Sequence, residues 1–370
     1  MSFSNFARCS ILSGICLALS PLLVNAADSF IGPFTKTTRI ASTVPGNGDV
    51  NPYGVFVVPR SVGNLVRGHI LVSNFNDSAN LQGTGTTIMD IAPNGTTRVF
   101  AHIKASALPG SCPGGVGLTT ALVVLSRGWV IVGSLPTTDG TAATARAGCL
   151  LVLNSQGHVV ETFSGTLNGT RINGPWDMTA LDLGEVAELF VSNVLNGTVA
   201  ARGSVVRQGT VVRLVLFIPT AGMPQEIVRT TIGSGFPEKT DPAALVIGPT
   251  GLGLAANGTL YVADTLANRI AAIPNAIFRP GSDGVGKTIS TRGAFNGPLG
   301  LAIAPNGDIL IVNANDGNIV ETTPLGSQVA VKTIDTSGAG AGTLFGLAVA
   351  PNAAGVYFVD DGDNTLDFLH

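Results

Sequence analysis

Residues 248–270, GPTGLGLAANGTLYVADTLANRI, contain the pattern that decides the fold. An apolar run leads into the dipeptide Asn257-Gly258, and a second apolar run follows it and ends at Asp264. Asn-Gly tolerates the positive φ angles that a tight hairpin turn needs, so this stretch predicts two short antiparallel strands. The phrase returns at 297–319 as GPLGLAIAPNGDILIVNANDGNI, which indicates that the chain is built from copies of one unit.

Six copies of this unit can be followed along the chain. Each has an apolar run, a turn, and a second apolar run that ends in a small polar residue. Two more strand-like runs follow, except in the last copy. The copies are anchored at Gly54, Gly117, Asp177, Gly251, Gly300 and Gly346. Their spacing suits four-stranded antiparallel blades joined by loops of variable length.

The last copy lacks one strand. After Asp360 only the run 365–369 remains, whereas the strand-like segment 34–42, FTKTTRIAS, precedes the first copy and has no partner there. Placing this segment as the outer strand of the last blade closes the ring and removes an exposed edge. The predicted fold class is therefore all-β: a six-bladed β-propeller of four-stranded antiparallel blades, closed by its N-terminal strand.

Composition excludes some classes of function. Only 12% of the residues are charged and the net charge is −3, whereas soluble domains carry about a quarter charged residues. Nucleic-acid affinity depends largely on Lys and Arg contacts to phosphates, so we expect no nucleic-acid partner. No run long enough to span a bilayer follows the N-terminus, so we expect no membrane span in the mature chain. We also expect a monomer.

The first 26 residues have the features of a signal peptide. A short segment with one positive side chain, Arg8, precedes an apolar run, and Val24-Asn25-Ala26 suits a cleavage site. We expect cleavage after Ala26, a single propeller domain over 27–370, and a secreted or periplasmic location. The alternative is an uncleaved anchor.

Two of the four cysteines, Cys9 and Cys16, would leave with the signal peptide. Cys112 and Cys149 would remain in an oxidising compartment, where an even pair predicts a disulfide. Two buried free thiols are the alternative.

The fourth and fifth copies resemble the NHL repeat, in which Pro-x-Gly precedes an Asn-Gly or Asp-Gly turn, then Tyr-Val-Ala-Asp and Asn-Arg-Ile. The resemblance is clearest over 248–370 and weak in the first three copies. It implies the six-bladed, TolB-like propeller superfamily that includes the SMP-30/gluconolactonase-like proteins. The resemblance implies the fold of this chain and says almost nothing about its function.

The strand directions place the ends of all second strands on one face of the ring, here called the top face. A set of small polar residues would lie there: Asn74, Ser134, Asn193, Asp264, Asn313 and Asp360. Calcium-dependent lactonases of similar fold use such oxygen ligands, so Asn193, Asp264, Asn313 and Asp360 are candidate ligands for Ca²⁺. The alternative is that these side chains hydrogen-bond to the backbone of the turns that follow them.

The first three copies also carry the long loops, all expected on the top face, where a rigid scaffold usually presents binding residues. Trp176 and Asp177 replace the small residues of the other copies near the axis. An aromatic ring there can stack on a ligand, or it can fill the space between blades.

We therefore expect an exported propeller that binds a small molecule or a protein partner at its top face, with Trp176, Asp177 and the six polar residues as candidate binding residues. No catalytic residue is assigned. The rival function is a Ca²⁺-dependent lactonase or hydrolase of the SMP-30-like kind, and the third is a structural or envelope-assembly module.

Overall fold

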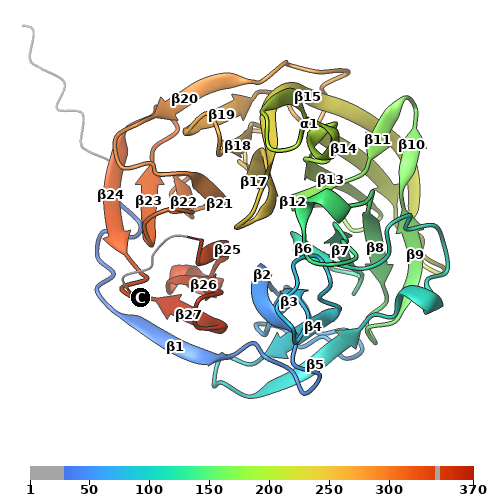
Figure 1. Ribbon diagram of the computed structural model, residues 1–370. Coiled ribbons are helices and arrows are strands. Elements are labelled where there is room, and N and C mark those ends of the chain that lie inside the picture. Colours follow the sequence, from blue (N-terminus) through green and yellow to red (C-terminus); the bar gives the residue numbers. More distant parts are fainter. Residues whose placement is uncertain (1–28, 338–341) are drawn as a thin grey trace, which may run out of the picture.

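The computed structural model describes residues 29–337 and 342–370, and it is a ring of six antiparallel β-sheets around a central axis (Figure 1). The predicted all-β, six-bladed propeller is confirmed. The expected signal peptide lies outside the described residues. Within the described part of the chain, no helix is long and apolar enough to cross a membrane.

Each blade has four strands, and the first lies next to the axis. The innermost strands of blades one to six are β2 (Val50–Val57), β6 (Leu118–Val124), β12 (Pro175–Asp182), β17 (Pro249–Leu254), β21 (Pro298–Ile303) and β25 (Leu344–Val349). The second strands are β3 (Ile70–Asn76), β7 (Val130–Ser134), β13 (Val186–Asn193), β18 (Leu260–Asp264), β22 (Ile309–Asn313) and β26 (Val356–Asp360). The third strands are β4 (Thr87–Ile91), β8 (Cys149–Leu153), β14 (Val206–Phe217), β19 (Arg269–Ile273), β23 (Asn318–Thr322) and β27 (Thr365–Leu369). The outermost strands are β5 (Thr97–His102), β9 (Val159–Phe163), β15 (Gln225–Asp241), β20 (Lys287–Thr291), β24 (Gln328–Thr333) and β1 (Thr37–Ser42).

The ring closes as predicted. Strand β1 pairs antiparallel with β27, with Thr38 opposite Phe368, and so completes blade six. The segment before β1 is anchored on blade five, because the buried carboxylate of Glu321 accepts hydrogen bonds from the N–H of Phe30 (2.6 Å) and of Ile31 (2.8 Å). Closure thus links the N-terminal segment to two blades.

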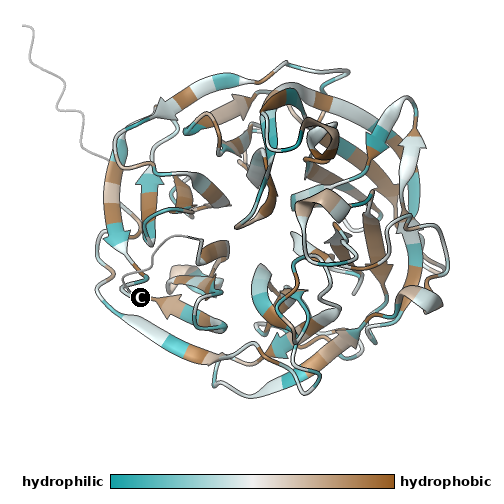
Figure 2. Cartoon of the chain, in the orientation of Figure 1, coloured by the Kyte–Doolittle hydropathy of each residue, from teal (hydrophilic) through white to brown (hydrophobic). Residues whose placement is uncertain are grey.

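The hydrophobic core lies between neighbouring blades. Leu71 of blade one packs in one cluster with Leu151 of blade two, for example. Inner strands such as β8 are buried along their whole length, whereas the outer strand β24 is mostly half-exposed and alternates hydrophilic and hydrophobic segments (Figure 2). The pattern is that of a ring whose outer rim faces solvent.

The Pro-x-Gly phrase has a structural cause at the axis. Every innermost strand shifts register beside its second strand at this point. A Cβ atom added at Gly300 would lie 1.8 Å from the carbonyl oxygen of Phe345, and one added at Gly346 would lie 2.2 Å from that of Tyr53. Glycine is needed there because the backbone of the next blade passes too close for a side chain.

Blade three departs from the prediction. Four strands are expected in each blade, but here β15 continues to Asp241 and turns back as β16 (Leu245–Ile247), which makes a five-stranded sheet. The cause is a longer β14, whose Val206 pairs with Glu238. We call residues 238–247 the top hairpin.

The remaining elements are short. They are the hairpin β10 (Gly165–Leu167) with β11 (Thr170–Ile172), the helix α1 (Thr198–Ala201), and the 3₁₀ turns Ala105–Ala107, Ala142–Thr144 and Pro351–Ala353.

Candidate functional site

The six small polar residues that end the second strands are engaged in their own blades. In blade three, Asn193 Oδ1 accepts the N–H groups of Asn173 (2.9 Å) and Gly174 (2.8 Å). In blade six, Asp360 Oδ1 accepts the N–H of Gly362 at 3.0 Å. The Asp360 contact is a turn-stabilising hydrogen bond of the alternative explanation, whereas Asn193 binds the segment that enters its blade.

The other four polar residues also make hydrogen bonds. The Arg269 guanidinium donates to Asp264 Oδ2 at 2.9 Å, and Asn313 Nδ2 donates to the carbonyl oxygen of Ala294 at 2.8 Å. Ser134 Oγ donates to a carbonyl oxygen of its own blade, and Asn74 Nδ2 donates to the carbonyl oxygen of Thr43 in the segment entering blade one. The structure places all six on the blades predicted, and each bonds within its own blade or to the segment that enters it.

Of the four candidate calcium ligands, Asp264 and Asn313 each keep a buried Oδ1 atom without a hydrogen-bond partner among the described residues. Asn193, Asp264, Asn313 and Asp360 belong to four different blades, and only two of them are carboxylates. The described residues contain no group of three His, Cys, Asp or Glu side chains placed to hold a metal. Because Ca²⁺ requires six to eight oxygen ligands around one point, we derive no step through it.

Trp176 lies in an aromatic plug on the axis, formed by Tyr53, Phe75, Trp176 and Phe345. The rings of Tyr53 and Phe345 stack at 3.8 Å, and that of Tyr53 lies 4.5 Å from that of Phe75. Trp176 is 2% exposed, and its Nε1 donates to the carbonyl oxygen of Val246 in the top hairpin at 3.1 Å. The plug and the hairpin together close the top mouth of the central channel.

Asp177 lies one residue below the plug and occupies the position of the glycine in Pro-x-Gly. Its Oδ2 accepts the N–H of Leu252, on the innermost strand of the next blade, at 2.9 Å. Burial raises the pKa of Asp177 to about 7, and the N–H groups of Leu252 and Met178 oppose that rise. A carboxyl group in this state changes charge near neutral pH.

A cavity of about 270 Å³ lies along the axis and is lined by the innermost strands of all six blades. Its wall is apolar apart from backbone, Asp177 and the threonines Thr120 and Thr179. Residues at the plug level, such as Leu299, are fully buried, whereas Leu254 and Ile303, lower on their strands, are half-buried. Exposure thus rises away from the top loops, so the channel opens on the bottom face.

A larger groove of about 450 Å³ lies on the top face between the top hairpin and blades four to six. Leu299 and Phe345 form part of its apolar lining. Its polar rim has an ion pair, Lys239 Nζ to Asp241 Oδ2 at 3.3 Å, and an amide pair in which Asn315 Nδ2 donates to Asn296 Oδ1 at 3.3 Å. An apolar lining with a few polar groups is the usual composition of a ligand site.

The top hairpin is held in place from several sides. Gln82 Nε2 of blade one donates to the carbonyl oxygen of Pro242 at 2.7 Å, and Glu238 Oε1 accepts the N–H of Asn196 at 3.1 Å. Burial raises the pKa of Glu238 to about 9, so this side chain is neutral at physiological pH. On its other flank the hairpin borders a second groove, which Ala142 helps to line.

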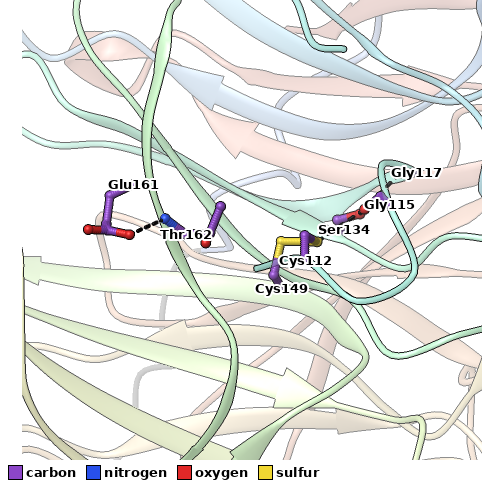
Figure 3. Close-up of a disulfide and its surroundings, with 7 residues drawn as sticks. All are labelled: Cys112, Gly115, Gly117, Ser134, Cys149, Glu161 and Thr162. Atoms are coloured by element: carbon purple, nitrogen blue, oxygen red, sulfur yellow. Dashed lines mark hydrogen bonds between the residues drawn. A yellow bond between two sulfur atoms is a disulfide. The ribbon is translucent and has the colours of Figure 1, made fainter. Parts of the chain in front are cut away.

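The predicted disulfide is confirmed. Cys112 and Cys149 are bonded, with their Cα atoms 5.2 Å apart. Figure 3 shows the bond beside Ser134, which opposes Cys149 across β7 and β8. The bond therefore ties the loop that enters blade two to that blade's third strand.

The groove residues Lys239, Asp241, Asn296 and Asn315 were missed from the sequence. Lys239 and Asp241 fall after the regular strands of the third copy, where no repeat pattern indicates a strand. Asn296 precedes a Gly-Pro step and Asn315 follows a strand end, positions where asparagine is common for turn formation alone.

The comparisons with known proteins agree on the fold. No family model and no curated protein matches the sequence. Among solved structures, a putative gluconolactonase is 16% identical with a TM-score of 0.55, covering 90% of this chain and 91% of its own. A gluconolactonase from Xanthomonas campestris is 12% identical with a TM-score of 0.54, covering 87% and 86%.

The calcium-binding protein regucalcin from Agrobacterium tumefaciens is 13% identical with a TM-score of 0.51, covering 91% and 93%. The neighbours are SMP-30/gluconolactonase-like six-bladed propellers, as the resemblance implied. At these identities the likeness establishes the architecture of this chain.

Proposed function

We propose that this protein is a binding propeller whose ligand occupies the top-face groove beside the top hairpin. The observation that carries the proposal is the groove itself, in which the apolar side chains of Leu299 and Phe345 lie next to an ion pair and an amide pair. The long β15–β16 extension of blade three builds one wall, and the regular blades build the other.

The lining suits a small molecule or peptide segment that combines an apolar part with both hydrogen-bond donors and acceptors. Side-chain amides offer both kinds of group, and the Lys239–Asp241 pair offers one charge of each sign. A volume of about 450 Å³ falls in the range of pockets that hold drug-sized ligands.

The test is a fragment screen by ligand-observed NMR, repeated on two variants. Ala244→Phe fills the groove from the top hairpin, and Ala142→Phe fills the second groove on the other flank. We expect hits that Ala244→Phe abolishes and Ala142→Phe leaves unchanged. Hits that survive Ala244→Phe would remove this groove as the site.

The rival lactonase function draws its support from the neighbours, two of which are described as gluconolactonases. In this chain the candidate ligands Asn193, Asp264, Asn313 and Asp360 lie on four blades, and each already makes a hydrogen bond or an ion pair in its own blade. A calcium titration separates the binding function from the calcium-dependent lactonase function.

We further propose that the protein is exported. A buried disulfide between Cys112 and Cys149 suits an oxidising compartment such as the periplasm or the extracellular space. Detection of a mature N-terminus at Ala27 in the exported fraction tests this proposal, and an intact Met1 there would contradict it.

A further inference from the structure

The part of the central channel below the aromatic plug, here called the lower channel, has two buried polar side chains in a mostly apolar wall. One is the Asp177 carboxyl group, which stands where four other blades have a glycine, Gly54, Gly251, Gly300 and Gly346. The other is Thr120 of the adjacent blade two, whose buried Oγ1 has no hydrogen-bond partner among the described residues. Thr120 is 5% exposed and lines the same cavity.

A buried hydroxyl without a partner and a carboxyl in an apolar wall both cost folding free energy. A ligand that donates hydrogen bonds to them would offset this cost. Apart from Thr179, the other side chains along the channel, including Leu122, Leu301 and Leu347, are apolar and suit the body of such a ligand.

We propose that the lower channel is a second binding site, which takes a small primary amine with an apolar body through the bottom face. The ammonium group donates to the Asp177 carboxylate and to Thr120 Oγ1, and the apolar part packs against the leucines below the plug. The aromatic plug separates this site from the top-face groove, so the two sites are independent.

The charge of the site favours a cation. Among the described residues, Asp177 is the only ionisable side chain that lines the channel. Its strand neighbours on β6, β13 and β17 present Thr120, Ser192 and Leu252, which are uncharged. No charged group contributes to the raised pKa of Asp177, which comes from burial alone. An ammonium group would be the first charge beside it and would favour its ionised form.

The experiment is calorimetric titration with benzylamine and with benzyl alcohol, its uncharged analogue. We expect benzylamine to bind at least tenfold more tightly than benzyl alcohol at pH 8. Asp177→Asn, which keeps an oxygen acceptor for the Leu252 N–H, should abolish this preference. Thr120→Val should weaken the binding of benzylamine severalfold. Affinity should rise from pH 5.5 to pH 8 as Asp177 ionises, because the amine stays protonated over this range.

Equal binding of amine and alcohol, no binding of either, or full binding by Asp177→Asn would overturn the proposal. If Asp177→Asn fails to fold, the proposal is tested by benzylamine binding to Thr120→Val and by the pH profile of benzylamine binding to the wild-type protein. The groove-filling Ala244→Phe variant is the control. It should leave benzylamine binding unchanged, and a loss there would place the amine in the top-face groove instead.

Discussion

Blade three and blade five use the same backbone position in opposite ways. In blade five, Gly300 lets the carbonyl oxygen of Phe345 approach, so the innermost strands of blades five and six touch directly. In blade three, Asp177 puts a carboxyl group between neighbouring strands, and its oxygen accepts the Leu252 N–H across the gap. The comparison shows that one site in the repeat can hold the ring together either by close approach or by a hydrogen-bonding side chain.

The carboxyl group of Asp177 destabilises the fold, and it also supplies a polar group to the channel. A buried carboxyl group is harder to ionise than one in water, as the raised pKa of Asp177 records. Asp177 also places an ionisable side chain in the wall of a mostly apolar cavity. The regular blades therefore provide stability, and the irregular blade provides the groups on which binding can depend.

The largest expected effect is the loss of close approach in blade five. Gly300→Ala would place its Cβ against a carbonyl oxygen of blade six, so we expect a loss of about 3 kcal/mol or more in unfolding free energy. The matched control is Gly281→Ala in the blade-four loop, where a Cβ would meet nothing within 4 Å. Urea denaturation of the two variants measures the difference. Equal stabilities would mean that close packing at the axis is not required.

The second largest expected effect is the loss of the disulfide. Replacing Cys112 and Cys149 together by serine should cost about 2–4 kcal/mol, because the bond restricts a loop in the unfolded chain. The loss should appear as faster hydrogen exchange in the loop entering blade two, while blades four to six stay protected. Uniform loss of protection around the ring would show that the bond acts on the whole fold instead.

The pH dependence of Asp177 has a definite sign. Its pKa is about 7 in the folded state and 3.8 ordinarily, so the folded state holds an extra proton between these values. Wild-type stability should therefore fall as pH rises from about 4 to about 7, by about 2–4 kcal/mol relative to Asp177→Asn. Denaturation of both proteins at pH 5 and pH 8 measures the difference, and parallel curves would contradict it. The comparison with the variant is needed because burial also raises the pKa of Asp360 and Asp361.

The smallest expected effect is that of calcium. Since the four candidate ligands are hydrogen-bonded or ion-paired on separate blades, millimolar Ca²⁺ or a chelator should change the unfolding temperature by less than about 1 °C. Thermal unfolding with and without each agent is the measurement. A clear stabilisation by Ca²⁺, lost in Asp264→Asn, would restore the lactonase hypothesis.

Much of the fold was predictable because the repeat is a local pattern. The Asn-Gly and Asp-Gly turns and the unpaired strands at the two ends of the chain specified six blades and their closure. The length of β15 was not predictable in this way, because it depends on pairing between Val206 and Glu238 in distant segments.

The site was less predictable for a related reason. The convergence of Tyr53, Trp176 and Phe345 into a plug follows from their shared place before the glycine position of Pro-x-Gly, which the sequence does display. The top-face groove has no such pattern, because it forms where the irregular hairpin meets the regular blades.

The most direct measurement of the central claim is a crystallographic fragment screen of the disulfide-bonded protein. The account predicts ligand density in the groove between the top hairpin and blades four to six, and amine density beside Asp177 below the aromatic plug. Ligands bound elsewhere, or a Ca²⁺ ion held by Asp264 and Asp360, would contradict it.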